Sequence, residues 1–357
     1  MKEGMFIHRR IGLALVITAV WGGVFAERAG SCEIKGRSTQ NDAAVMLSLS
    51  ADCTDAEREK HAVEAVQIID ALKRGKDVDL SGAVIHGDLL LDALVAGPVP
   101  QDLKAVPAIE GKEIRVIQGV VSIVNSIVHG TIRHQSTQDQ LVFRSPVTFS
   151  GTRFEQTVDL SRSVFMHPVV LSGAIFLRES YFVQARFLSD MVAEKTAFGP
   201  HTRFHRARFH EPVTFQESGF SGLAEFLEVE FERDANFSRT YFKLGTGFSG
   251  SRFRGMADFS ESLFDREAFF PFAVFEGDAF FRRATFRSTA DFSNAEFRGR
   301  DDFAKVLFER GPEFSGAKRT GGEKDLLGLE SPKIQYMITL SLLIFSALLI
   351  AYLIKSK

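Results

Sequence analysis

The chain has 357 residues, of which 45% are hydrophobic and 25% are charged, and its formal net charge is −2. This composition is sufficient for a large core in one elongated domain. Residues 143–314 hold 22 Lys and Arg against 24 Asp and Glu, so we expect neither a basic groove for nucleic acid nor an acidic DNA-like surface.

The N-terminal segment has the layout of a secretory signal peptide. Lys2 and Arg10 precede an apolar run over residues 11–25, and the small residue Ala26 follows it. A basic start, an apolar stretch and a small residue at its end are typical of an export signal. We therefore expect residues 1–26 to be a cleaved signal peptide, with retention as a membrane anchor as the alternative.

The chain has two cysteines, Cys32 and Cys53, and both follow the expected cleavage point. An oxidising compartment outside the cytoplasm favours a disulfide between them. Such a bond closes a loop of about 20 residues and stabilises the fold by on the order of 3 kcal/mol. Two free thiols are the alternative. A lipoprotein site at Cys32 is disfavoured, because the charged residues Glu27 and Arg28 separate it from the apolar run.

The N-terminal region, residues 27–79, is expected to contain a capping helix. Thr54-Asp55-Ala56-Glu57 has the form of a capping box, and Gly75 stands where a helix would stop. One helix face between them carries apolar residues, namely Ala62, Ala65, Val66, Ile69 and Leu72. A helix of this kind, placed before the first repeat, would cover strand edges at the end of the fold.

Residues 80–142 read as divergent repeats with an excursion. The segment from Leu80 to Ile85 has the form of one repeat, and Leu91 follows six residues after it. Residues 92–113 contain three prolines and look like a loop between coils. An apolar spacing of five and six residues then resumes at Val116, Val121, Ile127 and Ile132, with Gln138 in the next slot.

Residues 143–316 repeat every eleven residues, with a large apolar residue at alternate steps of six and five. The second register runs from Phe149 to Phe314 and departs from Phe at Leu160, Leu171 and Ala193. The first register is Phe throughout: Phe143, Phe154, Phe165, Phe176, Phe187, Phe198, Phe209, Phe220, Phe231, Phe242, Phe253, Phe264, Phe275, Phe286, Phe297 and Phe308. Such repetition indicates one small unit stacked on copies of itself.

Neither an α-helix nor a long flat strand fits this spacing. On a helix, steps of five and six place successive Phe about 140° and 240° apart, so no single apolar stripe forms. In a strand, an odd step sends the next side chain to the other face. The backbone must therefore turn between one Phe and the next.

The residues around each Phe indicate how it turns. Two positions earlier the residue is small or β-branched, as at Ala185, Ala207 and Ala290, so this position is also expected to be buried. Ser and Gly follow Phe in segments such as Phe248-Ser249-Gly250, and both residues suit tight turns. The unit is therefore a short extended segment with two inward side chains, followed by a corner.

At this point the sequence resembles the pentapeptide-repeat family, in which a small residue two positions before Leu or Phe recurs every five residues. The segment Ala290-Asp291-Phe292-Ser293-Asn294-Ala295-Glu296-Phe297 matches that pattern closely. The resemblance implies a right-handed, four-sided (quadrilateral) β-helix with about four repeats per coil. Because every second repeat here has a sixth residue, we expect coils of 22 residues, and the fold class is all-β.

The C-terminal end has the pattern of a membrane span. After a linker over 317–333, residues 334–354 carry no charge, and Lys355 begins a short basic tail over 355–357. Such a run is long enough to cross a lipid bilayer about 30 Å thick. Together with the export signal it predicts a single-pass protein of the bacterial plasma membrane, with the repeat domain outside and the tail in the cytoplasm.

Sequence motifs for catalysis or cofactors are lacking, so we expect a protein that is not an enzyme and has no cofactor or metal site. His205 and His210 each follow a register Phe and are expected to point from different faces, which is poor geometry for one metal ion. Asp291 and Glu313 should be neighbours on adjacent coils, but nothing before them in the sequence predicts a cleft.

The residue before each register Phe is expected to face solvent. In steps of 22, one face reads Arg186, Arg208, Glu230, Arg252, Val274 and Glu296. The opposite face carries no charge and reads Ile175, Ala197, Gly219, Tyr241, Leu263, Thr285 and Leu307. An uncharged strip in a solvated position indicates a contact surface, for which Ile175, Tyr241, Leu263 and Leu307 are the candidate residues. Strand propensity alone is the alternative explanation.

These patterns together predict a membrane-anchored scaffold or protein-binding module without catalysis, which contacts the bilayer through residues 334–354. The partner is expected to be an unidentified protein or a second copy of the chain. Two alternatives are topoisomerase protection by DNA mimicry, known for some soluble relatives in the family it resembles, and a glycan-binding or glycan-active β-helix. The balanced charge and the export signal speak against the first, and the lack of a predicted cleft speaks against the second.

Overall fold

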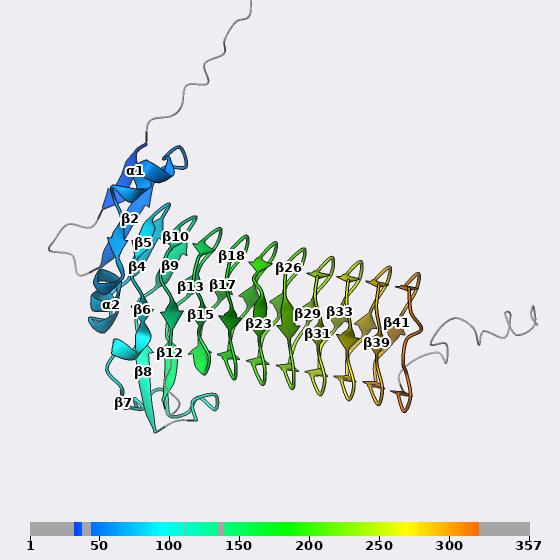
Figure 1. The fold of residues 1–357 in the computed structure, drawn as a ribbon. Helices are drawn as coiled ribbons and strands as arrows, with labels where there is room; N and C mark the ends of the chain where they lie inside the picture. The colour runs from blue at the N-terminus through cyan, green and yellow to red at the C-terminus, as the bar shows by residue number, and fades with distance from the viewer. Residues whose placement is uncertain (1–31, 38–43, 111, 135–138, 321–357) are drawn as a thin grey trace, which may run out of the picture.

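The computed structural model describes residues 32–37, 44–110, 112–134 and 139–320. They form a β-solenoid of about 11 coils with about 22 residues per coil, stacked into an elongated rod (Figure 1). The predicted signal peptide and the predicted membrane span lie outside the described residues. Among the residues that are described, no helix is both long enough and apolar enough to span a membrane.

Four mainly parallel sheets form the four sides of the rod, and each regular coil contributes a short strand to each side. Face A contains β1 (Ile34–Arg37), β2 (Val45–Leu49), β4 (Val78–Ser81), β9 (Val121–Val124), β13 (Val147–Thr148), β17 (Val169–Val170), β21 (Met191–Val192), β25 (Val213–Thr214), β29 (Ala235–Asn236), β33 (Ala257–Asp258), β37 (Ala279–Phe280) and β41 (Asp301–Asp302). Face B contains β3 (Val63–Glu64), β5 (Val84–His86), β10 (Ile127–Val128), β14 (Arg153–Phe154), β18 (Ile175–Phe176), β22 (Ala197–Phe198), β26 (Gly219–Phe220), β30 (Tyr241–Phe242), β34 (Leu263–Phe264), β38 (Thr285–Phe286) and β42 (Leu307–Phe308).

Faces C and D complete the coil, so that B and D lie on opposite sides. Face C contains β6 (Leu89–Leu90), β11 (Ile132–Arg133), β15 (Val158–Asp159), β19 (Ser180–Tyr181), β23 (His201–Arg203), β27 (Leu223–Glu225), β31 (Thr246–Gly247), β35 (Ala268–Phe269) and β39 (Ala290–Asp291). Face D contains β7 (Gly97–Pro98), β8 (Glu113–Ile117), β12 (Gln140–Phe143), β16 (Ser163–Phe165), β20 (Arg186–Phe187), β24 (Arg208–Phe209), β28 (Glu230–Phe231), β32 (Arg252–Phe253), β36 (Val274–Phe275), β40 (Glu296–Phe297) and β43 (Lys318–Arg319).

The core is a set of stacked phenylalanine rings, as the repeat predicts. Phe231 and Phe253 stack with ring centroids 4.6 Å apart, and Phe253 and Phe275 follow at 4.9 Å, with nearly parallel planes. Rings of the second register, such as Phe259, meet them edge to face. From Phe143 to Phe297, the residue two positions before each core Phe is buried as well, for example Ala207. Offset stacks and edge contacts are the favoured aromatic geometries, so the same residue type recurs in every coil.

The corners after the second-register residues, from Phe149 to Phe314, adopt left-handed backbone conformations. Gly250 has φ +68°, as the Phe-Ser-Gly segments predict. The same corner in the next coil carries Phe272, which has φ 58° and is 64% exposed. The turn is therefore imposed by the stacked coils even where the residue is not glycine, since left-handed conformations disfavour other residues.

The N-terminal region contains two helices where one was expected. α1 (Asp55–Glu59) begins with the predicted Thr54–Glu57 capping box, and α2 (Ala65–Lys73) ends before Gly75, which has φ +68°. Strand β3 separates them because Val63 pairs with Ile85 of the first coil. The expected apolar face was therefore wrong at Val66, which is 62% exposed.

Helix α2 covers the N-terminal end of the solenoid (Figure 1). Its buried residues include Ile68 and Leu72, which line a small apolar cavity together with Leu89 and Phe143 of the first coils. Beyond it, β2 pairs with β4 and β1 pairs antiparallel with β2, so face A extends past the first coil. At the other end β43 pairs with β40, so the solenoid includes part of the segment that was expected to be a linker.

The repeat upstream of Phe143 is shifted relative to the expected spacing. Ile117 pairs with Phe143 and Val128 pairs with Phe154, whereas Val116 and Ile127 lie outside the Phe columns. These two expectations were wrong by one position, because equivalent residues of these two coils are 26 residues apart. Val121 and Ile132 were wrong by two positions, since they pair with Val147 and Val158, each two residues before a register residue. Arg133 and Leu141 pair with Asp159 and Ser163 of the next coil, so the sequence between them is longer by four residues. The predicted slot at Gln138 lies outside the described residues.

A buried ion cluster lies in the same coil. His134 occupies a core position, and its Nε2 lies 3.1 Å from Oδ1 of Asp139. Arg115 Nη2 lies 3.0 Å from Oδ2 of the same carboxylate. A buried charge is expensive unless it is paired, so the contacts from His134 and Arg115 compensate the burial of the Asp139 carboxylate where the Phe pattern is interrupted.

The predicted excursion between coils packs on the outside of face D. β7 pairs antiparallel with β8, and Leu103 and Ala108 of the loop bury their side chains against Val142 and Val164. At the N-terminus, Cys32 and Cys53 form a disulfide.

Candidate functional site

The uncharged residues predicted on one side of the rod lie in one column of face B. Cα pairing runs through consecutive coils along Ile175, Ala197, Gly219, Tyr241, Leu263, Thr285 and Leu307, and we call this column the strip. Ile175 is 39% exposed and Leu307 is 55% exposed, while Tyr241 and Leu263 are half-buried.

Exposed leucines near the strip widen its apolar surface. Leu177 and Leu244 lie at the corner where face B turns into face C, and Leu223 begins the next strand, β27. All three are among the exposed large hydrophobic side chains. Sequence analysis missed them because they fall outside the two registers that define the core.

One end of Tyr241 belongs to a charged network. Its hydroxyl donates a hydrogen bond to the Asp265 carboxylate, and Arg287 Nη1 donates to the other carboxylate oxygen of Asp265 at 2.6 Å. Because of the Tyr241 hydrogen bond, the pKa of Asp265 is lowered and the pKa of Tyr241 is raised. The strip is therefore uncharged along its own column and bordered by charges at the next corner.

The opposite face D has the charged ladder that the sequence predicts. Arg208, Glu230 and Arg252 follow one another in register. Arg208 Nη2 lies 2.9 Å from Glu230 Oε1, and Arg252 Nη1 lies 2.5 Å from Glu276 Oε1. Faces B and D thus share the same backbone and the same inward rings but have different outer surfaces.

The histidines and carboxylates considered from the sequence lie in ordinary surface pairs. His210 Nδ1 lies 3.1 Å from Glu232 Oε2, and His205 is 3.8 Å from Glu228, so the two histidines have separate partners. Asp291 and Glu313 are neighbours on face C, as predicted. Hydrogen bonds from Ser315 lower the pKa of Glu313, which therefore favours the charged form.

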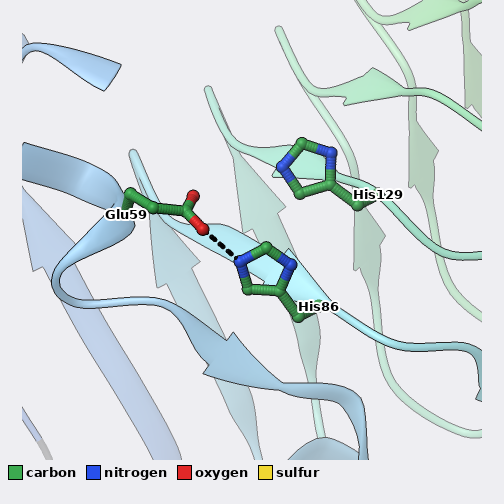
Figure 2. A group of neighbouring side chains, drawn as sticks. All are labelled: Glu59, His86 and His129. Carbon is green, nitrogen blue, oxygen red and sulfur yellow. Dashed lines mark hydrogen bonds and ion pairs between the residues drawn. The ribbon is translucent and has the colours of Figure 1, made fainter. Parts of the chain in front are cut away.

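A second cluster, which the sequence analysis missed, lies at the N-terminal end of face B. Glu59 ends α1, His86 ends β5 and His129 follows β10. The His86 and His129 rings stack with centroids 5.0 Å apart, and Glu59 Oε1 lies 2.5 Å from His86 Nε2 (Figure 2). One ligand atom from each of the three residues lies within 4.8 Å of the others.

A further carboxylate holds the His129 ring. His129 Nδ1 lies 2.7 Å from Glu155 Oε2, and Arg153 Nη2 lies 2.7 Å from the second oxygen of Glu155. The hydrogen bond with His129 lowers the pKa of Glu155, so this carboxylate is charged near neutral pH. It thereby favours the tautomer in which His129 Nδ1 carries the proton and Nε2 is an acceptor.

A repeated dipeptide was the signal that could have revealed this cluster. His86-Gly87 and His129-Gly130 each follow a buried Ile or Val, and they are in equivalent positions of adjacent coils. Gly130 lies so close to the preceding coil that a Cβ would be 1.9 Å from the carbonyl oxygen of Gly87. The excursion between the two coils separates the pair by 43 residues, which hides it from a search at the 22-residue period.

The Phe-rich repeat and the solenoid are consistent with pentapeptide repeats. Comparisons with known protein families, with curated proteins and with solved structures find no match for this chain.

Proposed function

We propose that this chain is a non-catalytic, protein-binding scaffold of the right-handed pentapeptide-repeat type, and that the strip on face B is its contact surface. The observation that supports this proposal is the contrast between two opposite faces of one regular rod. Face D carries a ladder of paired charges, while the strip on face B has seven consecutive coils without a charge in its column.

The physical basis for the proposal is the cost of removing water from each face. Burial of charged side chains under a partner requires new pairing for each of them. Apolar side chains are exposed at both ends of the strip, at Ile175 and Leu307, and at Leu177 near Ile175. A partner that covers them removes apolar surface from water, which favours binding. Tyr241 offers a ring and a hydroxyl at the middle of the strip, and tyrosine is common among residues that dominate binding.

The acidic residues support this function better than mimicry of DNA. A DNA mimic needs carboxylates that are free to meet basic residues of its target. Here Glu261 pairs with Arg239 at 3.1 Å and with Arg283 at 3.2 Å, on two neighbouring coils. Such alternating ion pairs neutralise the surface locally and are typical of a solvent-exposed surface. The paired carboxylates are therefore not available to imitate DNA phosphates.

We also propose that the repeat domain is exported and held at the membrane. The disulfide between Cys32 and Cys53 suits an oxidising compartment. A reporter active only outside the cytoplasm, inserted after Thr320 so that β43 is preserved, is expected to be active, whereas one fused after Lys357 is expected to be silent. If the reporter inserted after Thr320 is silent, and a reporter that works only in the cytoplasm is active at the same position, export is contradicted. The DNA-mimic alternative is then open again.

The double variant Tyr241→Lys with Leu263→Lys tests the contact surface. Two ammonium groups would have to be desolvated on association, whereas on a free surface they cost little. We expect partner binding or self-association to weaken by at least about tenfold, since residues central to an interface each contribute more than about 1 kcal/mol. Sedimentation measures self-association, and capture on the immobilised domain measures binding of a partner.

Val274→Lys provides the matched control for Leu263→Lys. Both residues are half-buried aliphatic side chains that precede a register Phe, but they lie on opposite faces. The control is expected to associate like wild type, and circular dichroism should show the same fold for all variants. Equal association of wild type, control and double variant would mean that the strip reflects strand propensity alone.

A further inference from the structure

We propose that Glu59, His86 and His129 form a binding site for one divalent transition-metal ion, with zinc as the preferred ion. Among the described residues, these three side chains form one group of potential metal ligands, with ligand atoms close enough to share an ion. The site lies at the N-terminal end of the rod, on the same face as the strip but in different coils, and it is independent of the proposed function.

The donor set determines the class of ion. Two imidazole nitrogens and one carboxylate oxygen are common zinc ligands, and a water molecule can complete a tetrahedron. Calcium and magnesium prefer oxygen ligands alone, so they fit this set poorly. Imidazole ligands also accept nickel and copper, which makes these ions the competitors to compare with zinc.

Metal binding requires the side chains to reorient, because the stacked His86 and His129 rings lie in nearly parallel planes, 19° apart, whereas an imidazole binds a metal in its own plane. Ligand atoms of a tetrahedral zinc ion lie about 3.3 Å apart, given bonds of about 2.0–2.1 Å. The three ligand atoms here lie within 4.8 Å of one another, and Glu59 Oε1 is 2.5 Å from His86 Nε2. The side chains of His86 and Glu59 are 36% and 51% exposed, so they have room to move and solvent can deliver the ion.

The surroundings of His129 are those of a metal ligand. Its Nδ1 lies 2.7 Å from Glu155 Oε2, which leaves Nε2 for the ion. Figure 2 shows this second ring nitrogen on the side of the ring that faces Glu59 and the bonded nitrogen of His86. Metal-binding histidines nearly always give their other ring N–H to a carboxylate or carbonyl group, which orients the ring and increases its basicity.

The side chain of Arg58 holds the neighbouring Glu59 close to the first coils. Arg58 Nη1 donates to the Asn125 carbonyl oxygen at 3.2 Å, and its Nε donates to the Cys53 carbonyl oxygen at 3.1 Å, so the end of α1 is fixed beside the first coils. An ion bound here would connect α1 to two adjacent coils, whose ligands His86 and His129 are 43 residues apart in the sequence. It would therefore stabilise the folded N-terminal end by binding the native state.

The experiment is calorimetric titration of the full-length chain, without a polyhistidine tag and stripped with chelator, with zinc chloride. We expect one ion per chain and a higher melting temperature when zinc is present. Removal of a ligand should weaken zinc binding more than removal of a residue that only hydrogen-bonds a ligand, for which the loss is typically about 10- to 100-fold. We expect this larger loss for His86→Gln, His129→Gln and Glu59→Gln. Glu155→Gln should fall within that range of about 10- to 100-fold, because it only positions a ligand.

His210→Gln is the matched control, because His210 Nδ1 has the same contact with a glutamate, Glu232, at 3.1 Å. It should bind zinc like wild type. Glu59 is half-exposed and outside the core, so Glu59→Gln remains a valid test if a histidine variant folds poorly. Failure of the wild type to bind one zinc ion, or equal binding by wild type, His86→Gln and His129→Gln, would overturn the proposal.

Discussion

Phe253→Ala and Phe264→Ala are each expected to lower the free energy of unfolding by about 3 to 5 kcal/mol, the range for truncating a large buried side chain. Both rings are fully buried. Phe264 stacks on Phe242 at 4.9 Å and on Phe286 at 4.4 Å, so its removal leaves a cavity between two rings that cannot approach each other. The backbone spacing of the coils fixes the distance between these neighbours.

Chemical denaturation followed by circular dichroism measures this loss. Phe272→Ala is the control, because Phe272 is 64% exposed and lies at a corner. Its effect is expected to stay within about 0.5 kcal/mol, as for most surface substitutions. Wild-type midpoints for Phe253→Ala and Phe264→Ala would show that the two Phe registers are not the core.

The repeat array was predictable because one local rule applies to every coil. The steps between Phe143 and Phe308 never vary, so the period alone gives the coil length, the inward residues and the face that each outward residue occupies. The column from Ile175 to Leu307 follows from the same period. Repeat units contact only their neighbours, so no distant information was needed.

The N-terminal coils could not be predicted in the same way, because their shape depends on insertions. The four additional residues between Arg133 and Leu141 move the core positions to Ile117 and Val128, and no local pattern predicts such an insertion. The helix between Thr54 and Gly75 is divided because Val63 pairs with the first coil. Tertiary pairing here prevails over helix propensity, which is a weak preference.

The candidate sites were also predictable from the sequence only in part. The sequence placed Tyr241 and Leu263 in one column, but the hydrogen bond from Tyr241 to Asp265 depends on a side chain in the next coil. The meeting of His86 and His129 depends on the length of an excursion whose ends had to be known first. Contacts between coils of regular length are readable from the sequence, and contacts across an insertion are not.

Cross-linking of paired cysteines tests the coil length, on which the whole account depends. Glu230→Cys with Arg252→Cys places two thiols on residues that pair in neighbouring coils. Adjacent strands lie about 4.8 Å apart, which is within the range that a disulfide spans. Glu230→Cys with Tyr241→Cys is the control, since eleven residues separate faces D and B.

The measurement is the fraction of monomer with an internal cross-link after mild oxidation, with the site identified by mass spectrometry. Four-sided coils of 22 residues predict nearly complete cross-linking of the 230–252 pair and none of the 230–241 pair. Cross-linking of the 230–241 pair, or none for the 230–252 pair in a folded chain, would contradict the solenoid and the placement of the strip on one face.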